Sequence, residues 1–183
     1  MKHFAIEGST LSLRSEWIQD LLRGIVPEEL AAFRGKKGCL FSNISLQHYI
    51  EEEYRHENFL LSPDKTRSIR TYSSGEQKKA LLEYQIRQAP DFMILDNPFD
   101  SLDQESVDIL RERINRLHEQ MPIIQIFKRH DDLLPFISHV LLVREEKTIA
   151  MLPLPDYLDS LRLNPQQRSE NPIPPSPNPY NDI

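Results

Sequence analysis

Apolar positions along the chain follow two patterns that predict two kinds of element. Short, continuous apolar runs predict strands at 4–6, 38–41, 92–95, 123–127, 139–143 and 148–152. Apolar positions three and four residues apart predict helices at 14–23, 46–59, 74–88 and 104–121. Because strands alternate with helices, we expect an α/β fold with a mostly parallel sheet and helices on both of its faces.

The ends of these elements carry recognisable start and stop signals. Gly24 follows the first predicted helix, and Pro122 follows the last one. Asp103 is a suitable N-cap for that last helix, because its carboxylate accepts hydrogen bonds from the free N–H groups of the first turn. The run at 92–95 is apolar at four successive positions, as expected of a strand that is buried on both faces.

The composition changes at Asn164. The last 20 residues hold six of the chain's 14 prolines and almost no aliphatic side chains, so they cannot bury enough apolar surface to fold alone. We therefore expect a folded domain at 1–160, with a helical subdomain at about 44–88, and a Pro-rich linker or tail at 161–183. A linker implies one half of a tandem protein, and a frayed C-terminal tail is the alternative.

Composition and charge limit the class of protein and its expected location. With 183 residues, 39% hydrophobic and 27% charged, the chain is typical of a globular domain, and no apolar run approaches the ~20 residues of a membrane span. The start of the sequence lacks the apolar region of a secretory signal, and the single cysteine, Cys39, excludes an internal disulfide. We therefore expect a cytoplasmic protein. Its net charge of -6 argues against nucleic acid as a partner.

Two neighbouring segments carry the residue types of phosphate chemistry. Asp96 ends the strand at 92–95, and an acidic residue at the carboxyl end of a parallel strand lies at the ligand edge of the sheet. There it can hold Mg²⁺ through a water molecule. The preceding helix begins at Ser73, Ser74 and Gly75, and a helix N-terminus offers free N–H groups and the positive dipole end to a phosphate.

Four segments in this order resemble motifs of the ATP-binding cassette (ABC) ATPases. They are Tyr72–Gln77 (YSSGEQ), similar to the LSGGEQ signature; Phe92–Asp96, similar to the Walker B strand; Pro98 with Asp100–Asp103, similar to the D-loop; and His130, at the place of the switch histidine. The resemblance implies a P-loop NTPase-like fold that uses ATP and Mg²⁺, with Asp96 as the magnesium-binding residue. Among subfamilies, it is nearest to tandem cassettes of the molybdate-transport type.

The N-terminal region departs from the family. No intact Walker A motif (GxxGxGKS/T) is present, and the best candidate is GSTLSLRS at 8–15. In this candidate Arg14 stands at the lysine and Ser15 at the Mg²⁺-binding hydroxyl, but Leu11–Leu13 replace the small residues that let backbone amides wrap phosphates. The glycines and lysines at 35–38 precede a strand rather than a helix, so we discount them.

The second departure lies at the catalytic position. Asn97 follows Asp96 directly, where the family has its catalytic glutamate. An amide cannot accept a proton from water, although it can orient one. General-base catalysis is worth roughly 10²–10⁴ in rate, so we expect hydrolysis to be slow or nil at a site built from Asp96, Asn97 and His130.

In this family two cassettes dimerise head to tail, and each ATP lies between one cassette's Walker A and the other's signature. The resemblance therefore implies that Ser73, Ser74, Gly75 and Glu76 close over ATP held by a second cassette, fused or separate, while Asp103 reports closure. Membrane transporter subunits would be further partners. The alternative is a non-catalytic regulatory subunit that keeps the fold without binding nucleotide.

Two other interpretations are weaker. Cassettes of chromosome maintenance carry long coiled coils, but 46–70 shows no sustained heptads. Glu53 and His56 have the Glu-x-x-His spacing of di-iron helix bundles, yet such sites need a second copy and further carboxylates. We therefore expect the helix at 46–59 to be a solvated helix of the helical subdomain.

Overall fold

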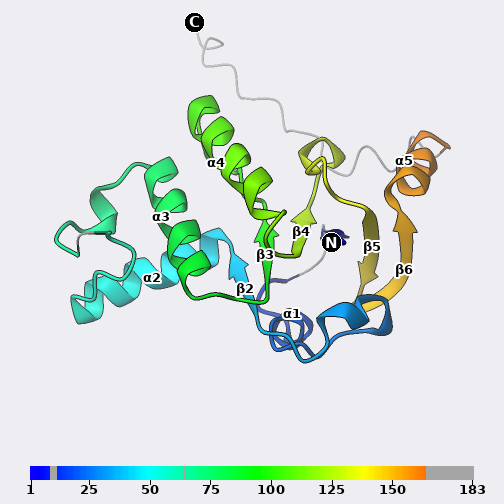
Figure 1. Ribbon diagram of the computed structural model, residues 1–183, viewed down its shortest axis with the longest axis horizontal. Helices are drawn as coiled ribbons and strands as arrows, with labels where there is room; N and C mark the ends of the chain where they lie inside the picture. The colour runs from blue at the N-terminus through cyan, green and yellow to red at the C-terminus, as the bar shows by residue number, and fades with distance from the viewer. Residues whose placement is uncertain (9–11, 64, 164–183) are drawn as a thin grey trace, which may run out of the picture.

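The computed structural model describes residues 1–8, 12–63 and 65–163. Its strands form one six-stranded sheet in the order β2-β3-β4-β1-β5-β6 (Figure 1). The strands are β1 (Phe4–Glu7), β2 (Gly38–Phe41), β3 (Phe92–Asp96), β4 (Ile123–Phe127), β5 (His139–Arg144) and β6 (Lys147–Pro153). All neighbouring pairs are parallel except β5 and β6, which form an antiparallel hairpin. The predicted mostly parallel sheet is confirmed.

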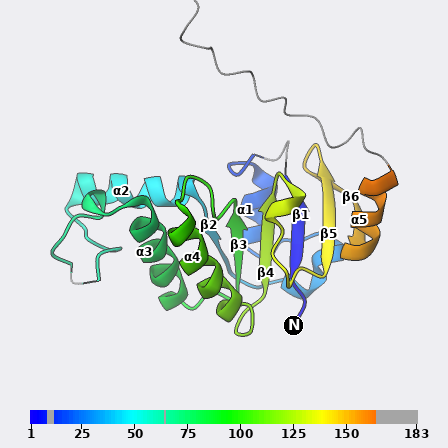
Figure 2. The same ribbon diagram turned by 90° about the horizontal axis from the view of Figure 1, so that it is seen from above.

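Helices cover both faces of this sheet (Figure 2). The described residues form α1 (Glu16–Leu22), α2 (Asn43–His56), α3 (Ser74–Arg87), α4 (Gln104–Leu117) and α5 (Leu154–Leu163), with 3₁₀ turns η1 (Glu28–Phe33), η2 (Ile69–Thr71) and η3 (His130–Asp132). One apolar cluster joins α1 and η1 to the sheet, and a second joins α2, α3, α4 and α5 to its other face. The predicted α/β architecture is therefore confirmed.

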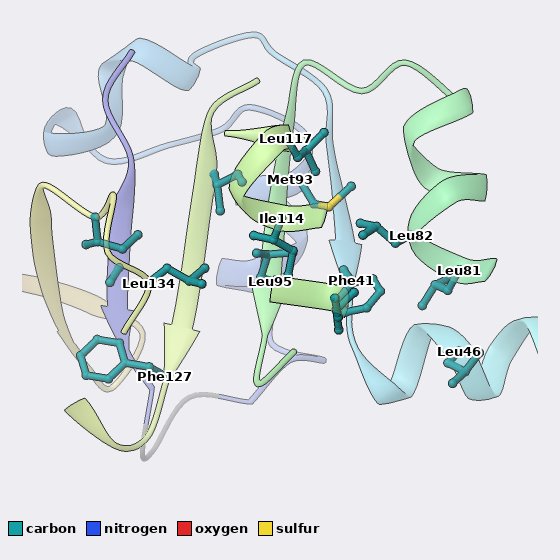
Figure 3. Packing of buried hydrophobic residues seen from close by; sticks show 14 of the residues in the cluster. Phe41, Leu46, Leu81, Leu82, Met93, Leu95, Ile114, Leu117, Phe127 and Leu134 are labelled. Carbon is teal, nitrogen blue, oxygen red and sulfur yellow. The ribbon is translucent and has the colours of Figure 1, made fainter. Parts of the chain in front are cut away.

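Alternation along the strands explains the two clusters. In β1, Phe4 and Ile6 join the cluster on the α1 side, whereas Ala5 joins the opposite one, because successive side chains of a strand point to opposite faces. On the α4 side, Ile114 and Leu117 pack around the side chains of β3 (Figure 3). Both faces are thus covered, which is the usual setting of a parallel sheet.

Several helix ends differ from the prediction. The helix predicted at 46–59 begins at Asn43, because the Ser42 hydroxyl accepts a hydrogen bond from the Ser45 amide at 3.0 Å. It ends where Glu57 adopts a left-handed backbone with φ 51°. The helix predicted to reach position 121 ends at Leu117.

One helix was not predicted from the sequence. Helix α5 begins just after β6, and its Tyr157 and Leu161 are buried against the rest of the domain. It runs across position 160, where the sequence placed the end of the folded domain. The Pro-rich segment at 164–183 lies outside the described residues.

Helix α2 is largely exposed, as predicted for a solvated helix, but Glu53 is an exception. Its side chain is buried, and its carboxylate accepts hydrogen bonds from the Ser68 hydroxyl and from the Ile69 amide at 3.2 Å. His56 is exposed, and its Nε2 lies 3.7 Å from Oε2 of Glu52. Glu53 therefore attaches α2 to the segment that leads into α3, and it does not face His56 as a shared ligand would.

None of the helices in the described part of the chain is long and apolar enough to cross a membrane.

Candidate functional site

The carboxyl ends of β1, β3 and β4 meet at one edge of the sheet. Asp96 pairs in register with Ile126, and Glu7 pairs with Phe127. Beyond the end of β1, the Gly8 amide donates a hydrogen bond of 3.0 Å to the Phe127 carbonyl. The structure thus brings the start of the candidate phosphate loop, Asp96 and the segment before His130 to the same edge, as the parallel topology requires.

Asp96 and Asn97 contact each other directly. The Asn97 side-chain amide donates to Oδ1 of Asp96 at 2.8 Å, and Asn97 itself has a left-handed backbone with φ 41°. Burial raises the pKa of the Asp96 carboxyl above its ordinary value, while the hydrogen bond from Asn97 and the positive charge of Lys128 oppose that rise. One carboxylate oxygen of Asp96 is therefore already engaged by its neighbour.

A cavity of about 400 Å³ lies beside this pair. Its lining includes the turn after β3 and the residues just after β4: Asn97, Pro98, Phe99, Asp100, Ser101, Gln125, Lys128, Arg129 and Asp132. Asp96 and His130 are not among its lining residues. His130 lies next to the cavity as the half-buried first residue of η3. Its predicted role as a switch stays a prediction.

The described part of the candidate Walker A segment forms an ordinary helix start. Ser15 is the buried N-cap of α1, and its hydroxyl accepts a hydrogen bond from the Ile18 amide at 3.3 Å. Arg14 is exposed, and its backbone amide donates to the Ser12 hydroxyl at 3.3 Å. Residues 9–11 lie outside the described residues, so the predicted phosphate-binding roles of Arg14 and Ser15 stay predictions.

The signature-like segment forms the start of α3 through a capping box. The Ser73 hydroxyl accepts a hydrogen bond from the Glu76 amide at 3.2 Å, and the Glu76 carboxylate accepts one from the Ser73 amide at 2.8 Å. The second of these bonds lowers the pKa of the Glu76 carboxyl. Ser73 and Ser74 are exposed, so this helix start is accessible.

The same helix start lies against the start of α4. Gly75 is so close to Ser106 that a Cβ at Gly75 would lie 2.2 Å from the Ser106 hydroxyl oxygen. The Ser106 amide in turn donates to Asp103 at 2.8 Å, and this cap lowers the pKa of the Asp103 carboxyl. Ser73, Gly75, Glu76 and Asp103 all line one groove of about 470 Å³ between the two helices. Ser74 is not among the residues that line it.

Sequence reasoning missed the residue that connects these two regions. Lys78 of α3 is buried, and its ammonium group donates to the Pro98 carbonyl at 3.1 Å and to the Asp100 carbonyl at 2.6 Å. The signal was present in the sequence, because Lys78 shares a helix face with Leu81 and Leu82, both of which are buried.

The described residues do not form a magnesium site by themselves. Mg²⁺ prefers six oxygen ligands, and it is usually held by one or two carboxylates, several waters and the phosphates of a substrate. Here Asn97 occupies one oxygen of Asp96, and the Ser15 hydroxyl caps α1. No group of three His, Cys, Asp or Glu side chains in the described ranges is arranged to hold a metal ion.

The sheet and its covering helices define an α/β domain with a mostly parallel sheet. No family model matches the chain. The chain is 36% identical over 73 residues to the ABC transporter ATP-binding protein ModF of Escherichia coli. This match covers 39% of this chain and 15% of ModF. The chain is also 26% identical over 152 residues to an uncharacterized ABC transporter ATP-binding protein of Schizosaccharomyces pombe. This match covers 79% of this chain and 30% of that protein.

The solved structures show the same fold. An ATP-binding cassette of an ABC transporter, solved in its ADP conformation, matches with a TM-score of 0.55 at 14% identity, over 90% of this chain and 85% of that one. The resemblance to ABC ATPase nucleotide-binding domains is thereby confirmed, and the chain has the fold of an ABC cassette. The chain spans less than a third of the length of either curated relative.

Proposed function

We propose that this chain is an ABC-type cassette of a transporter that donates its signature segment to ATP held by a second cassette, while its own phosphate loop is degenerate. The observation that carries the proposal is the start of α3. Ser73 and Ser74 are exposed there at the amino end of a 14-residue helix, and Asp103 lies at the same groove. Free N–H groups and the helix dipole suit this end to a phosphate.

The residues at the carboxyl edge of this chain's own sheet are poorly suited to bind and hydrolyse ATP, which supports the donor role. Asn97 replaces the residue that would act as general base, and it uses its amide to hold Asp96. Arg14, at the lysine position, is exposed and precedes a helix of only seven residues. ATP and Mg²⁺ would therefore be bound chiefly by the second cassette. A cytoplasmic location and contact with membrane transporter subunits belong to the same proposal.

Titration calorimetry with Mg-ATP on the isolated chain is the first test. We expect no measurable binding, either by the natural chain or by the Arg14→Ala variant. Binding that the Arg14→Ala change abolishes would show a working phosphate loop at 8–15 and would contradict the donor role.

The second test measures ATP hydrolysis by a candidate partner cassette with an intact Walker A motif, with and without the chain. We expect the chain to stimulate hydrolysis, and we expect Ser74→Arg to abolish the stimulation, because the large side chain would block the exposed helix start. Gln88→Arg adds the same charge at the opposite end of α3 and serves as the matched control. If the Ser74→Arg variant stimulates hydrolysis as well as the natural chain does, the result would favour the non-catalytic regulatory subunit. The hydrogen bond between Asn97 and Asp96 is the observation that supports this alternative.

A further inference from the structure

The start of α3 and the turn after β3 are joined by one buried lysine. Lys78 is only 5% exposed, and its nitrogen bonds two carbonyls of the same turn, those of Pro98 and Asp100. The two partners lie twenty and more positions further along the chain. Lys78 is thus a long-range connection between the signature-like segment and the acidic end of β3.

Burying an ammonium group is costly unless its donors are satisfied. Burial lowers the pKa of Lys78, while the negative charges of Asp100 and Asp96 act in the opposite direction. A methionine would fill nearly the same space without this cost. What the ammonium group supplies, and a methionine does not, is a pair of charged hydrogen bonds with fixed direction onto the turn.

The turn that receives these bonds has an unfavourable backbone. Asn97 and Ser101, at its two ends, both adopt left-handed conformations, with φ values of 41° and 61°. This conformation is unfavourable for residues other than glycine, less so for asparagine than for serine, and it persists only where the surroundings hold it. The turn also carries the Asn97 amide that bonds Asp96, and it leads directly to Asp103, the cap of α4.

We propose that Lys78 is a positioning residue that fixes the turn at 97–101 against the start of α3. The exposed signature segment and the Asp96–Asn97 pair then move as one unit. The close approach of Gly75 to Ser106 joins the start of α3 to α4, the helix that follows this turn. The purpose of this link, to report closure over a partner's ATP to the chain's own acidic edge, rests on the proposed function. The link itself does not.

The natural chain provides the first test by nuclear magnetic resonance. A lysine ammonium group that bonds two carbonyls gives scalar couplings from Nζ to both carbonyl carbons, and its protons exchange slowly with water. We expect such couplings from Lys78 to the carbonyls of Pro98 and Asp100, and none from the exposed neighbour Lys79. Absence of both couplings in the folded chain would overturn the proposal, and this measurement requires no variant to fold.

Three variants test the consequence. In Lys78→Met we expect exchange of the Asp100 amide, which bonds the Asn97 carbonyl at 3.1 Å, to quicken about tenfold, because the turn opens locally. Lys78→Arg keeps charged donors and should restore slow exchange at Asp100 in part. Lys79→Met removes the same charge from the exposed neighbour and should leave this exchange unchanged.

A folded Lys78→Met variant in which the Asp100 amide exchanges at the same rate as in the natural chain would refute the positioning role. An equal change in Lys79→Met would do so too, because the effect would then be one of net charge. These readings need neither nucleotide nor a second cassette. They can therefore support the positioning role of Lys78 even if the proposed signature donation is wrong. They can also refute that role even if the proposed donation is right.

Discussion

The packing of Gly75 against Ser106 gives a quantitative prediction about the two helix starts. A Cβ added at Gly75 would lie 2.2 Å from the Ser106 hydroxyl oxygen and 2.8 Å from the Ser106 Cβ. Rotation of the hydroxyl can relieve the first contact, at the expense of its 3.2 Å hydrogen bond to Asp103. The second contact remains, so the helices must separate slightly.

The expected effect of Gly75→Ala is the balance of two terms. Overpacking costs about 1–3 kcal/mol, whereas replacing glycine by alanine in a helix gains at most about 1 kcal/mol. We therefore expect a net loss of about 1 kcal/mol, which corresponds to roughly 2–4 °C in Tm for a domain of this size. Urea denaturation followed by circular dichroism measures it.

A double-mutant cycle identifies the cause of that loss. Ser106→Gly alone should cost about 0.5 kcal/mol through helix propensity. In the double variant the overlap disappears, and the gain from the alanine remains. The two changes should therefore couple favourably by about 1 kcal/mol or more. A Gly75→Ala variant that is more stable than the natural chain, or a coupling near zero, would show that the helix starts are not in contact.

Two further predictions concern stability. Burial, with the nearby charges of His118 and the chain's amino group, lowers the pKa of His3 to about 4. The unfolded chain therefore binds the extra proton first as the pH falls from 6.5 towards 4. Urea denaturation at pH 7 and pH 4.5 should show a loss of about 2.5 kcal/mol, and His3→Gln should flatten this dependence. Arg113 bonds Glu83 through two contacts of 2.6 and 3.0 Å between α4 and α3. Because both side chains are about one-third exposed, a cycle of alanine variants should give a coupling of only about 0.5–1 kcal/mol, which 1 M NaCl weakens.

The sequence predicted those parts of the fold that depend on local pattern. Strand β3 could be predicted from four successive apolar residues. The role of Asp103 as the N-cap of α4 could be predicted from its place before an amphipathic helix. Helix α5 has an equally readable apolar spacing at Leu154, Tyr157 and Leu161, but its position between a strand and a Pro-rich segment hid it. The signal for this helix is therefore local and present in the sequence.

The contacts that organise the site could not be read in the same way. Lys78 could be placed on the buried face of α3, but its carbonyl partners follow from the way α3 packs beside the turn after β3. The burial of Glu53 likewise depends on where the chain places the Ile69 amide. Both depend on tertiary geometry that no spacing of residues along one element encodes.

The signature-like residues do not contribute equally to the choice between the two proposed roles. Ser73 and Glu76 form a capping box, which would stabilise α3 in any protein, and Asp103 caps α4 in the same ordinary way. Their presence is therefore explained without a nucleotide. Ser74 differs, because it is exposed at the first position of α3 and, among the described residues, its side chain has no hydrogen bond that would account for it. The case for signature donation thus depends on Ser74 more than on the motif as a whole, which is why the variant of that residue is the decisive one.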